Sequence, residues 1–192
     1  MKVAYDYDPL LYWHSLHVAS FAAPFTAYLG YPPQDQYRIV QASLLHDLGK
    51  IYIPHSLLNK PAPLSAREFG EVQRHPEIGY ALLAEEVQDD LILDVVLHHH
   101  ERLDGSGYPD RLRGTEISDS VRLVTICDIY AAMTEVRPYR AQLSAQKAFQ
   151  TMWSMTDGID SMLLDVFKDS QIWKEREPKL AELCPIDYKR AN

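Results

Sequence analysis

Apolar positions along this chain recur mainly with the period of an α-helix, and the alternation typical of strands is scarce. The segment 89–99 is the clearest case. Apolar side chains at positions 91 and 95, and again at 92 and 96, lie four residues apart and form two neighbouring stripes on one helix face. The stripes end in His99 and His100, so two imidazoles extend an apolar face. This pattern predicts a mostly helical protein with polar chemistry in its interior.

Proline and glycine divide the pattern into separate helices. The run Gly30-Tyr31-Pro32-Pro33 ends the first predicted helix. Loops are predicted over 51–63, which holds three prolines, and over 104–114, which holds three glycines and a proline. Helices are predicted at 9–29, 34–46, 89–99 and 120–135, with shorter ones after Ser65 and Pro76 and two or three more in the C-terminal third. Without a repeat or a long linker, these elements indicate an all-α bundle, a single domain over residues 1–192 with no separate regulatory domain.

Composition narrows the functional classes. With 46% apolar and 24% charged residues, the 192-residue chain is typical of a globular protein. The formal net charge of −8 argues against a nucleic-acid polymer as partner, whereas a phosphate substrate stays compatible because bound metal ions reverse the field locally. The longest apolar stretch, 18–29, is interrupted by Pro24 and is too short to span a bilayer. No export signal opens the chain, and Cys127 and Cys184 form no disulfide framework, so we expect a cytoplasmic protein without membrane contact.

Histidines beside carboxylates are the notable chemical feature among the eight histidines. His46-Asp47 lies at the end of a predicted helix, and imidazole with carboxylate suits divalent metals such as iron, manganese or zinc. Adjacent side chains on a helix diverge by about 100°, so both reach one ion only where the backbone breaks. We expect Gly49 to supply that break. Asp128, in the middle of an apolar helix, would be costly to bury without a cation.

Two motifs resemble the signature of the HD-GYP family, a subgroup of HD-domain phosphohydrolases that hydrolyse cyclic di-GMP in bacteria. The first is His46-Asp47-Leu48-Gly49-Lys50, and the second runs from His99-His100-Glu101 to Asp104-Gly105-x-Gly107-Tyr108-Pro109. Shorter matches are His14-Ser15-x-x-Val18-Ala19, Arg74-His75-Pro76-x-x-Gly79 and Arg137-Pro138-Tyr139-Arg140. The resemblance covers about residues 14–167 and implies an HD-domain helical bundle around a metal centre.

What the resemblance implies for the site is carried over position by position. It implies a centre of two divalent metal ions, iron or manganese first and nickel or zinc as alternatives. The implied ligands are His14, His46, Asp47 and Asp128 for one ion and His75, His99 and His100 for the other, with Asp47 bridging both. The positions implied to contact substrate are Lys50, Tyr108, Arg137 and Arg140, with Asp47 and Lys50 as the catalytic pair.

Several residues keep a second interpretation at this point. His14 and His17 lie one turn apart, and the match at Ser15 and Val18 favours His14. Lys50 is also a suitable C-terminal helix cap. Glu101 either orients a ligand histidine or caps the helix break. His98 is expected to be a surface residue that points away from the His99/His100 face and pairs with Asp94.

Two positions depart from the family pattern. Leu10 stands where three-metal relatives have a glutamate, which favours two ions over three. Ala131 stands where many relatives have a second aspartate, and its loss is expected to weaken metal binding if that aspartate orients a ligand.

The implied activity is hydrolysis of cyclic di-GMP, or a related cyclic dinucleotide, to the linear dinucleotide or further to GMP, by attack of a hydroxide that bridges the metals. One alternative is an HD-type phosphohydrolase of mononucleotides, against which the Gly107-Tyr108-Pro109 loop argues. Another is a non-catalytic module that senses the dinucleotide or docks on a protein, and Ala131 keeps it open. A diguanylate cyclase or another regulatory protein is the expected kind of protein partner.

Overall fold

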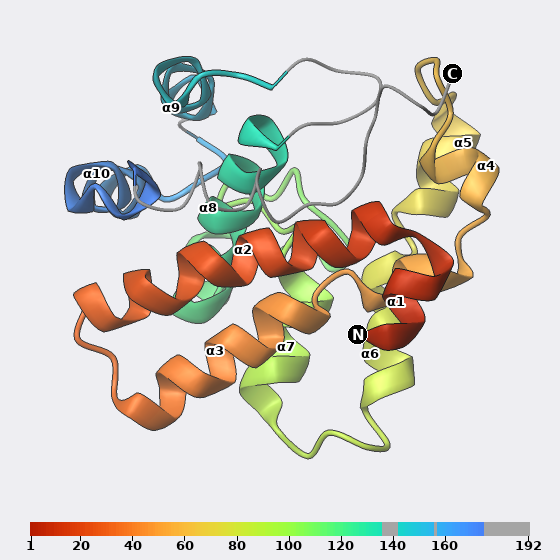
Figure 1. Cartoon of the computed structure of the whole chain (residues 1–192), viewed down its shortest axis with the longest axis horizontal. Helices are drawn as coiled ribbons and strands as arrows, with labels where there is room; N and C mark the ends of the chain where they lie inside the picture. Colours follow the sequence, from red (N-terminus) through yellow and green to blue (C-terminus); the bar gives the residue numbers. More distant parts are fainter. Residues whose placement is uncertain (136–141, 156, 175–192) are drawn as a thin grey trace.

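The computed structural model describes residues 1–135, 142–155 and 157–174, which form helices and connecting loops (Figure 1). The only strand-like pairing among these residues is an isolated bridge between Asp104 and Arg113. In chain order the helices are α1 (Lys2–Tyr7), α2 (Pro9–Tyr28), α3 (Pro33–Leu45), the 3-10 helix η1 (Leu48–Tyr52), α4 (His55–Leu58), α5 (Ala66–Val72), α6 (His75–Leu83), α7 (Asp90–His98), the 3-10 helix η2 (Gly114–Glu116), α8 (Asp119–Thr134), α9 (Ala145–Trp153) and α10 (Ser161–Ser170). The predicted all-α bundle is confirmed.

The helix boundaries follow the predicted breakers. Helix α2 starts with Pro9 in its first turn, where a missing N–H costs nothing, and the Asp8 side chain caps it by accepting a hydrogen bond from the backbone N–H of Leu10 at 2.9 Å. It ends before Gly30, whose φ of +75° suits glycine. The prediction of a loop across 51–63 is wrong in part, because α4 forms directly after Pro54, a position at which proline is tolerated.

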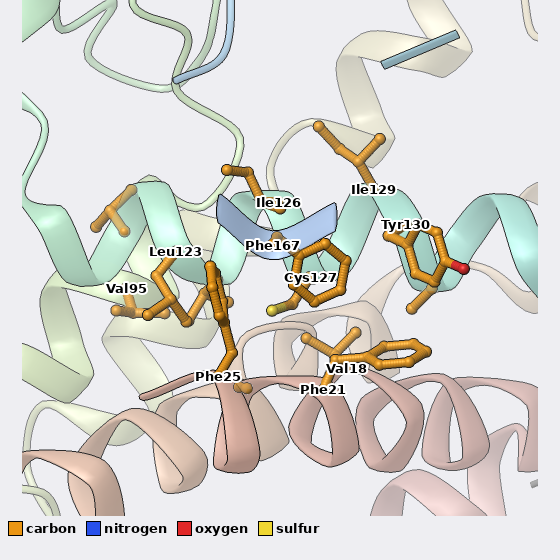
Figure 2. Close-up of a cluster of buried hydrophobic side chains, with 14 of the residues drawn as sticks. Val18, Phe21, Phe25, Val95, Leu123, Ile126, Cys127, Ile129, Tyr130 and Phe167 are labelled. Carbon is orange, nitrogen blue, oxygen red and sulfur yellow. The ribbon is translucent and has the colours of Figure 1, made fainter. Parts of the chain in front are cut away.

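Helices α2 and α8 cross at the centre of the molecule and carry its aromatic core. Figure 2 shows Phe21 and Phe25 of α2 pointing toward α8, Phe25 beneath Leu123 and Phe21 on the side of Tyr130, with Phe167 of α10 lying between the two helices. The rings of Phe21 and Tyr130 have centroids 5.2 Å apart, and those of Phe25 and Phe167 are 5.0 Å apart. Because edge-to-face aromatic pairs fix ring positions, α2 and α8 form a firm frame for the polar residues that they also carry.

The remaining helices surround this frame. Helices α2 and α3 run side by side as an antiparallel pair, and α7 packs on α3 while α6 packs on both α7 and η1 (Figure 1). Helices α9 and α10 lie at one end of the molecule, and α1, α4 and α5 lie at the other (Figure 1). Among the described residues, no helix combines the length and apolarity that crossing a bilayer requires.

The aromatic core predicts a large difference between two substitutions on the same helix. Phe167→Ala should lower the free energy of unfolding by about 3–5 kcal/mol, because Phe167 is completely buried and its removal leaves a cavity. Met162→Ala is the control, since Met162 is 80% exposed and its loss should change stability by less than about 0.5 kcal/mol. Urea unfolding followed by circular dichroism measures both. Equal effects would contradict the assignment of Phe167 to the core.

Candidate metal centre

The backbone breaks at His46-Asp47. Helix α3 ends at Leu45, His46 keeps helical angles as its cap, and Asp47 leaves them with φ −99° and ψ 6° before η1 begins. The break lets both side chains face one point, with Nε2 of His46 3.4 Å from Oδ2 of Asp47. The predicted break is therefore present, although Gly49 does not form it.

Gly49 serves a different purpose from the one expected. It lies inside η1, where a Cβ atom would come within 2.0 Å of the carbonyl oxygen of His75 and 2.6 Å of the backbone nitrogen of Gly79. Only glycine permits this contact between η1 and α6. The approach brings His75, the first residue of α6, beside Asp47.

One group of possible ligands joins Asp47 to three histidines. Single ligand atoms of Asp47, His75, His99 and His100 all lie within 4.8 Å of one another. Oδ1 of Asp47 is 3.2 Å from Nε2 of His75 and 3.6 Å from Nε2 of His99. The ends of α6 and α7 and the loop after α3 thus converge on one carboxylate oxygen.

A second group uses the other oxygen of the same carboxylate. Ligand atoms of His14, His46 and Asp47 also lie within 4.8 Å of one another, and Oδ2 of Asp47 is 3.7 Å from Nε2 of His14. Oδ1 of Asp128 is 2.9 Å from Nε2 of His14 and 3.9 Å from Nε2 of His46. Asp47 is the member common to both groups, so it occupies the position of a bridge.

Backbone hydrogen bonds set the orientation of three of these imidazoles. In each, Nδ1 faces a carbonyl oxygen, which only accepts, so Nδ1 carries the proton and Nε2 of the neutral ring has the lone pair. The bonds join His46 to Ser43 (2.8 Å), His75 to Val72 (2.7 Å) and His99 to Val96 (3.0 Å). All three lone pairs therefore point into the two groups.

The polar atoms left inside the site fit a cation. The Nε2 atoms of His75 and His99 lie 3.3 Å apart, and in the neutral rings neither has a proton to share. Within the described part of the chain, Nε2 of His46 and Oδ1 of Asp47 are buried without a hydrogen-bond partner. Unpaired buried acceptors are costly, and a divalent metal ion with imidazole and carboxylate ligands satisfies them together.

Burial keeps the three histidines of the first group, His75, His99 and His100, in the form that can bind metal. It lowers the pKa of His99 to about 4 and also lowers the pKa of His75, despite the opposing effect of Asp47 on both. Burial and the neighbouring His99 hold the pKa of His100 well below its usual value. These rings are neutral at physiological pH, as metal coordination requires.

The two carboxylates stay ionised even though they are buried. Burial opposes ionisation of Asp47, but Lys50 and His46 outweigh it and hold the pKa well below its usual value. Burial likewise opposes ionisation of Asp128, and the hydrogen bond from His14 outweighs it, so that the pKa is also held low. Burial opposes protonation of His14, but the charge of Glu135 and the hydrogen bond to Asp128 outweigh it and raise its pKa to about 10. Two negative charges therefore lie beside a cationic His14 and the neutral rings of His75, His99 and His100, and a metal ion held by the carboxylates would replace a proton of His14.

Lys50 lies at the edge of the site and is more than a helix cap. Its Nζ is 2.5 Å from Oδ2 of Asp47, and its side chain is 22% exposed. One end of this ion pair thus faces the buried groups and the other faces solvent. Lys50 is placed to meet both a buried ligand and a molecule arriving from outside.

The glycine-rich loop over 104–114 is held by Glu101. This buried side chain accepts hydrogen bonds from the backbone N–H groups of Asp110, Arg111 and Leu112 at 2.7, 2.9 and 3.1 Å. Both expected roles for Glu101, orienting a ligand histidine and capping the helix break, are therefore wrong. Three successive N–H groups on one carboxylate instead anchor the loop beside His100.

The loop places Tyr108 against His100, a member of the first group of possible ligands. Its ring lies 4.8 Å from that of His100, tilted by 34°, and 6.4 Å from the exposed ring of Phe69 on α5. Gly107 makes this possible, because a Cβ there would come within 2.4 Å of Cα of Glu101. The predicted substrate residue Tyr108 thus borders the candidate centre.

His98 points away from the centre, as predicted. Its Nδ1 is 2.6 Å from Oδ1 of Asp94, which confirms the expected pair, although the ring is mostly covered. Its Nε2 is 3.0 Å from Oδ2 of Asp110, a contact that the sequence did not indicate. His98 thus ties α7 to the same loop that Glu101 anchors.

Sequence reasoning missed Glu135, whose Oε2 is 2.9 Å from Nδ1 of His14. The available signal was its position seven residues after Asp128, two helical turns along the same face. His17, the alternative to His14, is in neither candidate group; its Nδ1 is 3.9 Å from Glu135. Arg137 and Arg140 lie outside the described residues.

Comparison with known proteins identifies the family of this chain. The family model described as "HD domain" matches residues 1–163. The chain is 38% identical, over 161 residues, to a cyclic di-GMP phosphodiesterase of Pseudomonas aeruginosa, a match that covers 83% of this chain and 39% of that protein. It is 34% identical, over 155 residues, to a 3′3′-cGAMP-specific phosphodiesterase of Vibrio cholerae, covering 80% of this chain and 36% of that protein. The chain thus spans about two fifths of the length of these curated relatives.

A solved structure shares the fold. Bd1817, an HDG"Y"P protein of Bdellovibrio bacteriovorus, superposes with a TM-score of 0.70 at 18% identity, covering 83% of this chain and 51% of Bd1817. The helical arrangement is therefore common to both proteins, although their sequences have diverged widely.

The close contact at Gly49 predicts a loss of both stability and metal. Gly49→Ala should lower the free energy of unfolding by about 1–3 kcal/mol or more and reduce bound metal, because η1 must move away from α6 and His75. Gly70→Ala is the matched control: a Cβ at Gly70 in α5 meets nothing within 4 Å, so the change should stabilise by roughly 0.5–1 kcal/mol. Urea unfolding and elemental analysis measure both. Normal metal content in the Gly49 variant would refute the account.

Proposed function

This chain belongs to the HD-domain family, and we therefore propose that it is a metal-dependent phosphodiesterase that opens the ring of a cyclic dinucleotide. The observation that carries the proposal is the carboxylate of Asp47, which is shared by two groups of buried histidines. Those groups lie beside a loop with the HD-GYP sequence, and curated relatives with about 35% identity act on cyclic dinucleotides.

The proposed centre holds two divalent metal ions. The proposed ligands are His14, His46, Asp47 and Asp128 for one ion and Asp47, His75, His99 and His100 for the other. Iron or manganese suits this mixture of imidazole and carboxylate best, with nickel and zinc as alternatives. Such ions lower the pKa of water to about 7 and stabilise negative charge on phosphoryl oxygens.

The side chains of the protein would orient the substrate and neutralise its charge. Lys50, which pairs with Asp47 and keeps 22% of its side chain exposed, is proposed to meet a substrate phosphate or to protonate the leaving 3′-oxygen. Tyr108, beside His100, is proposed to contact the dinucleotide at the edge of the centre. The matches at Arg137 and Arg140 support phosphate contacts from the next segment of the chain.

The proposed substrate class is cyclic di-GMP or 3′3′-cGAMP, the two that the relatives' names give, with the linear dinucleotide or GMP as product. A mononucleotide phosphohydrolase and a non-catalytic sensor are the competing functions. Incubating the metal-loaded chain with each cyclic dinucleotide and with a panel of nucleoside phosphates, then separating the products, tests all three. Binding without product would favour the sensor. A diguanylate cyclase or other regulatory partner remains a prediction.

Asp47→Ala should abolish turnover and lower bound metal, because its carboxylate faces both groups. Elemental analysis of the saturated parent should give two metal ions per chain, and the variant should retain fewer. Glu85→Ala is a control that removes an exposed carboxylate. A parent chain with three ions, or a fully active Asp47 variant, would reject the two-metal scheme.

Arg137→Ala and Arg140→Ala should each lower kcat/KM by roughly ten- to a hundred-fold while leaving metal content unchanged. The loss of a charge-assisted hydrogen bond to phosphate costs about 1.5–3 kcal/mol. Lys147→Ala, which removes one exposed positive charge from α9, is the control and should have normal kinetics. If all three variants match the parent, the two arginines are solvated and do not contact substrate.

A further inference from the structure

His14 differs from the other imidazoles of the proposed centre in the partner of its Nδ1 atom. In His46, His75 and His99, Nδ1 donates to a backbone carbonyl. In His14, Nδ1 lies 2.9 Å from Oε2 of Glu135, while Nε2 faces Asp128 at 2.9 Å. The ring is therefore held at both nitrogens by carboxylates.

The two carboxylates come from one face of α8 and its end. Glu135 follows the last residue of α8, and its backbone N–H still donates to the carbonyl of Ala131 at 2.9 Å. Its Cα therefore continues the last turn of the helix. Its position, two turns after Asp128, directs its side chain toward α2 as well. Both Glu135 and His14 are largely covered, with side-chain exposures of 16% and 6%.

A carboxylate partner changes an imidazole more than a carbonyl does. A full negative charge on the acceptor strengthens the hydrogen bond that Nδ1–H donates, holds the proton on Nδ1 and increases the electron density available at Nε2. We propose that Glu135 is a positioning residue for metal: it holds Nδ1–H of His14 and so aims Nε2 into the group formed with His46 and Asp47. This inference rests on the proposed metal centre and assigns the residue that supports one of its ligands.

Ala131 offers the proposed site no ligand and no hydrogen-bond partner through its side chain. It is completely buried among apolar residues of the core. Glu135 lies one turn further along the same helix face and has a longer side chain. The carboxylate that reaches His14 from this face, besides Asp128, is that of Glu135.

The test compares Glu135→Gln, which keeps the shape but loses the charge, with Glu135→Ala and with the control Glu86→Gln, a change of an exposed glutamate. The full chain is freed of metal and titrated with Co²⁺, whose visible absorption reports its ligands. The dissociation constant of one of two bound ions should rise about ten-fold in the glutamine variant and up to about a hundred-fold in the alanine variant. The other ion and the control should be unaffected.

A second measurement reads the hydrogen bond without metal. In ¹⁵N-edited NMR spectra of the metal-free chain, the Nδ1–H proton of His14 should resonate far downfield in the parent and lose this shift in Glu135→Ala. Urea unfolding checks that each variant is folded. Unchanged Co²⁺ affinity and an unchanged His14 signal in folded variants would overturn the proposal, as would a change in stability alone.

These readouts separate the inference from the proposed function. Neither requires a dinucleotide, so a chain that shows the expected order of Co²⁺ affinities yet leaves every cyclic dinucleotide intact would refute the phosphodiesterase and support the role of Glu135. A chain that hydrolyses its substrate with equal Co²⁺ affinity in all variants would support the function and refute the role of Glu135.

Discussion

The buried carboxylate of Asp47 is the constraint around which the rest of this structure is arranged. It is 1% exposed, and its two oxygens face different sets of imidazoles that come from α2, the end of α3, α6 and the end of α7. A charge in that position is tolerable only with compensation, which Lys50 supplies at the edge and a cation would supply inside. Four segments of the chain therefore converge on one carboxylate.

The apolar core supports a site that contributes little stability by itself. Buried polar groups with unpaired atoms oppose folding. The aromatic contacts between α2, α8 and α10 lie on the same helices that carry His14 and Asp128, so the interactions that stabilise the frame also set the distance between these ligands. Rigidity at the core is thus transferred directly to the site.

Much of the fold and of the site was predictable from the sequence, since both depend on local signals. Proline and glycine mark both ends of α2 and the start of α3, and polar residues on apolar stripes mark the candidate ligands, which the structure brings together. Contacts between distant segments were not predictable. The target of Glu101, the contact of Gly49 with α6 and the bond from Glu135 to His14 depend on how helices pack, which periodicity does not specify. Arg137 and Arg140 remain predictions from the motif alone.

The anchoring of the glycine-rich loop has a consequence for recognition. Glu101 holds its backbone at three successive N–H groups, and His98 holds it again through Asp110. Glu101 and His98 flank His99 and His100 in the chain, so this loop and these candidate ligands form one preorganised unit. The loop loses its conformational entropy when the protein folds and not when a ligand binds. Discrimination by this loop should therefore depend on a fixed shape, and adaptation to different ligands would have to come from residues outside the loop.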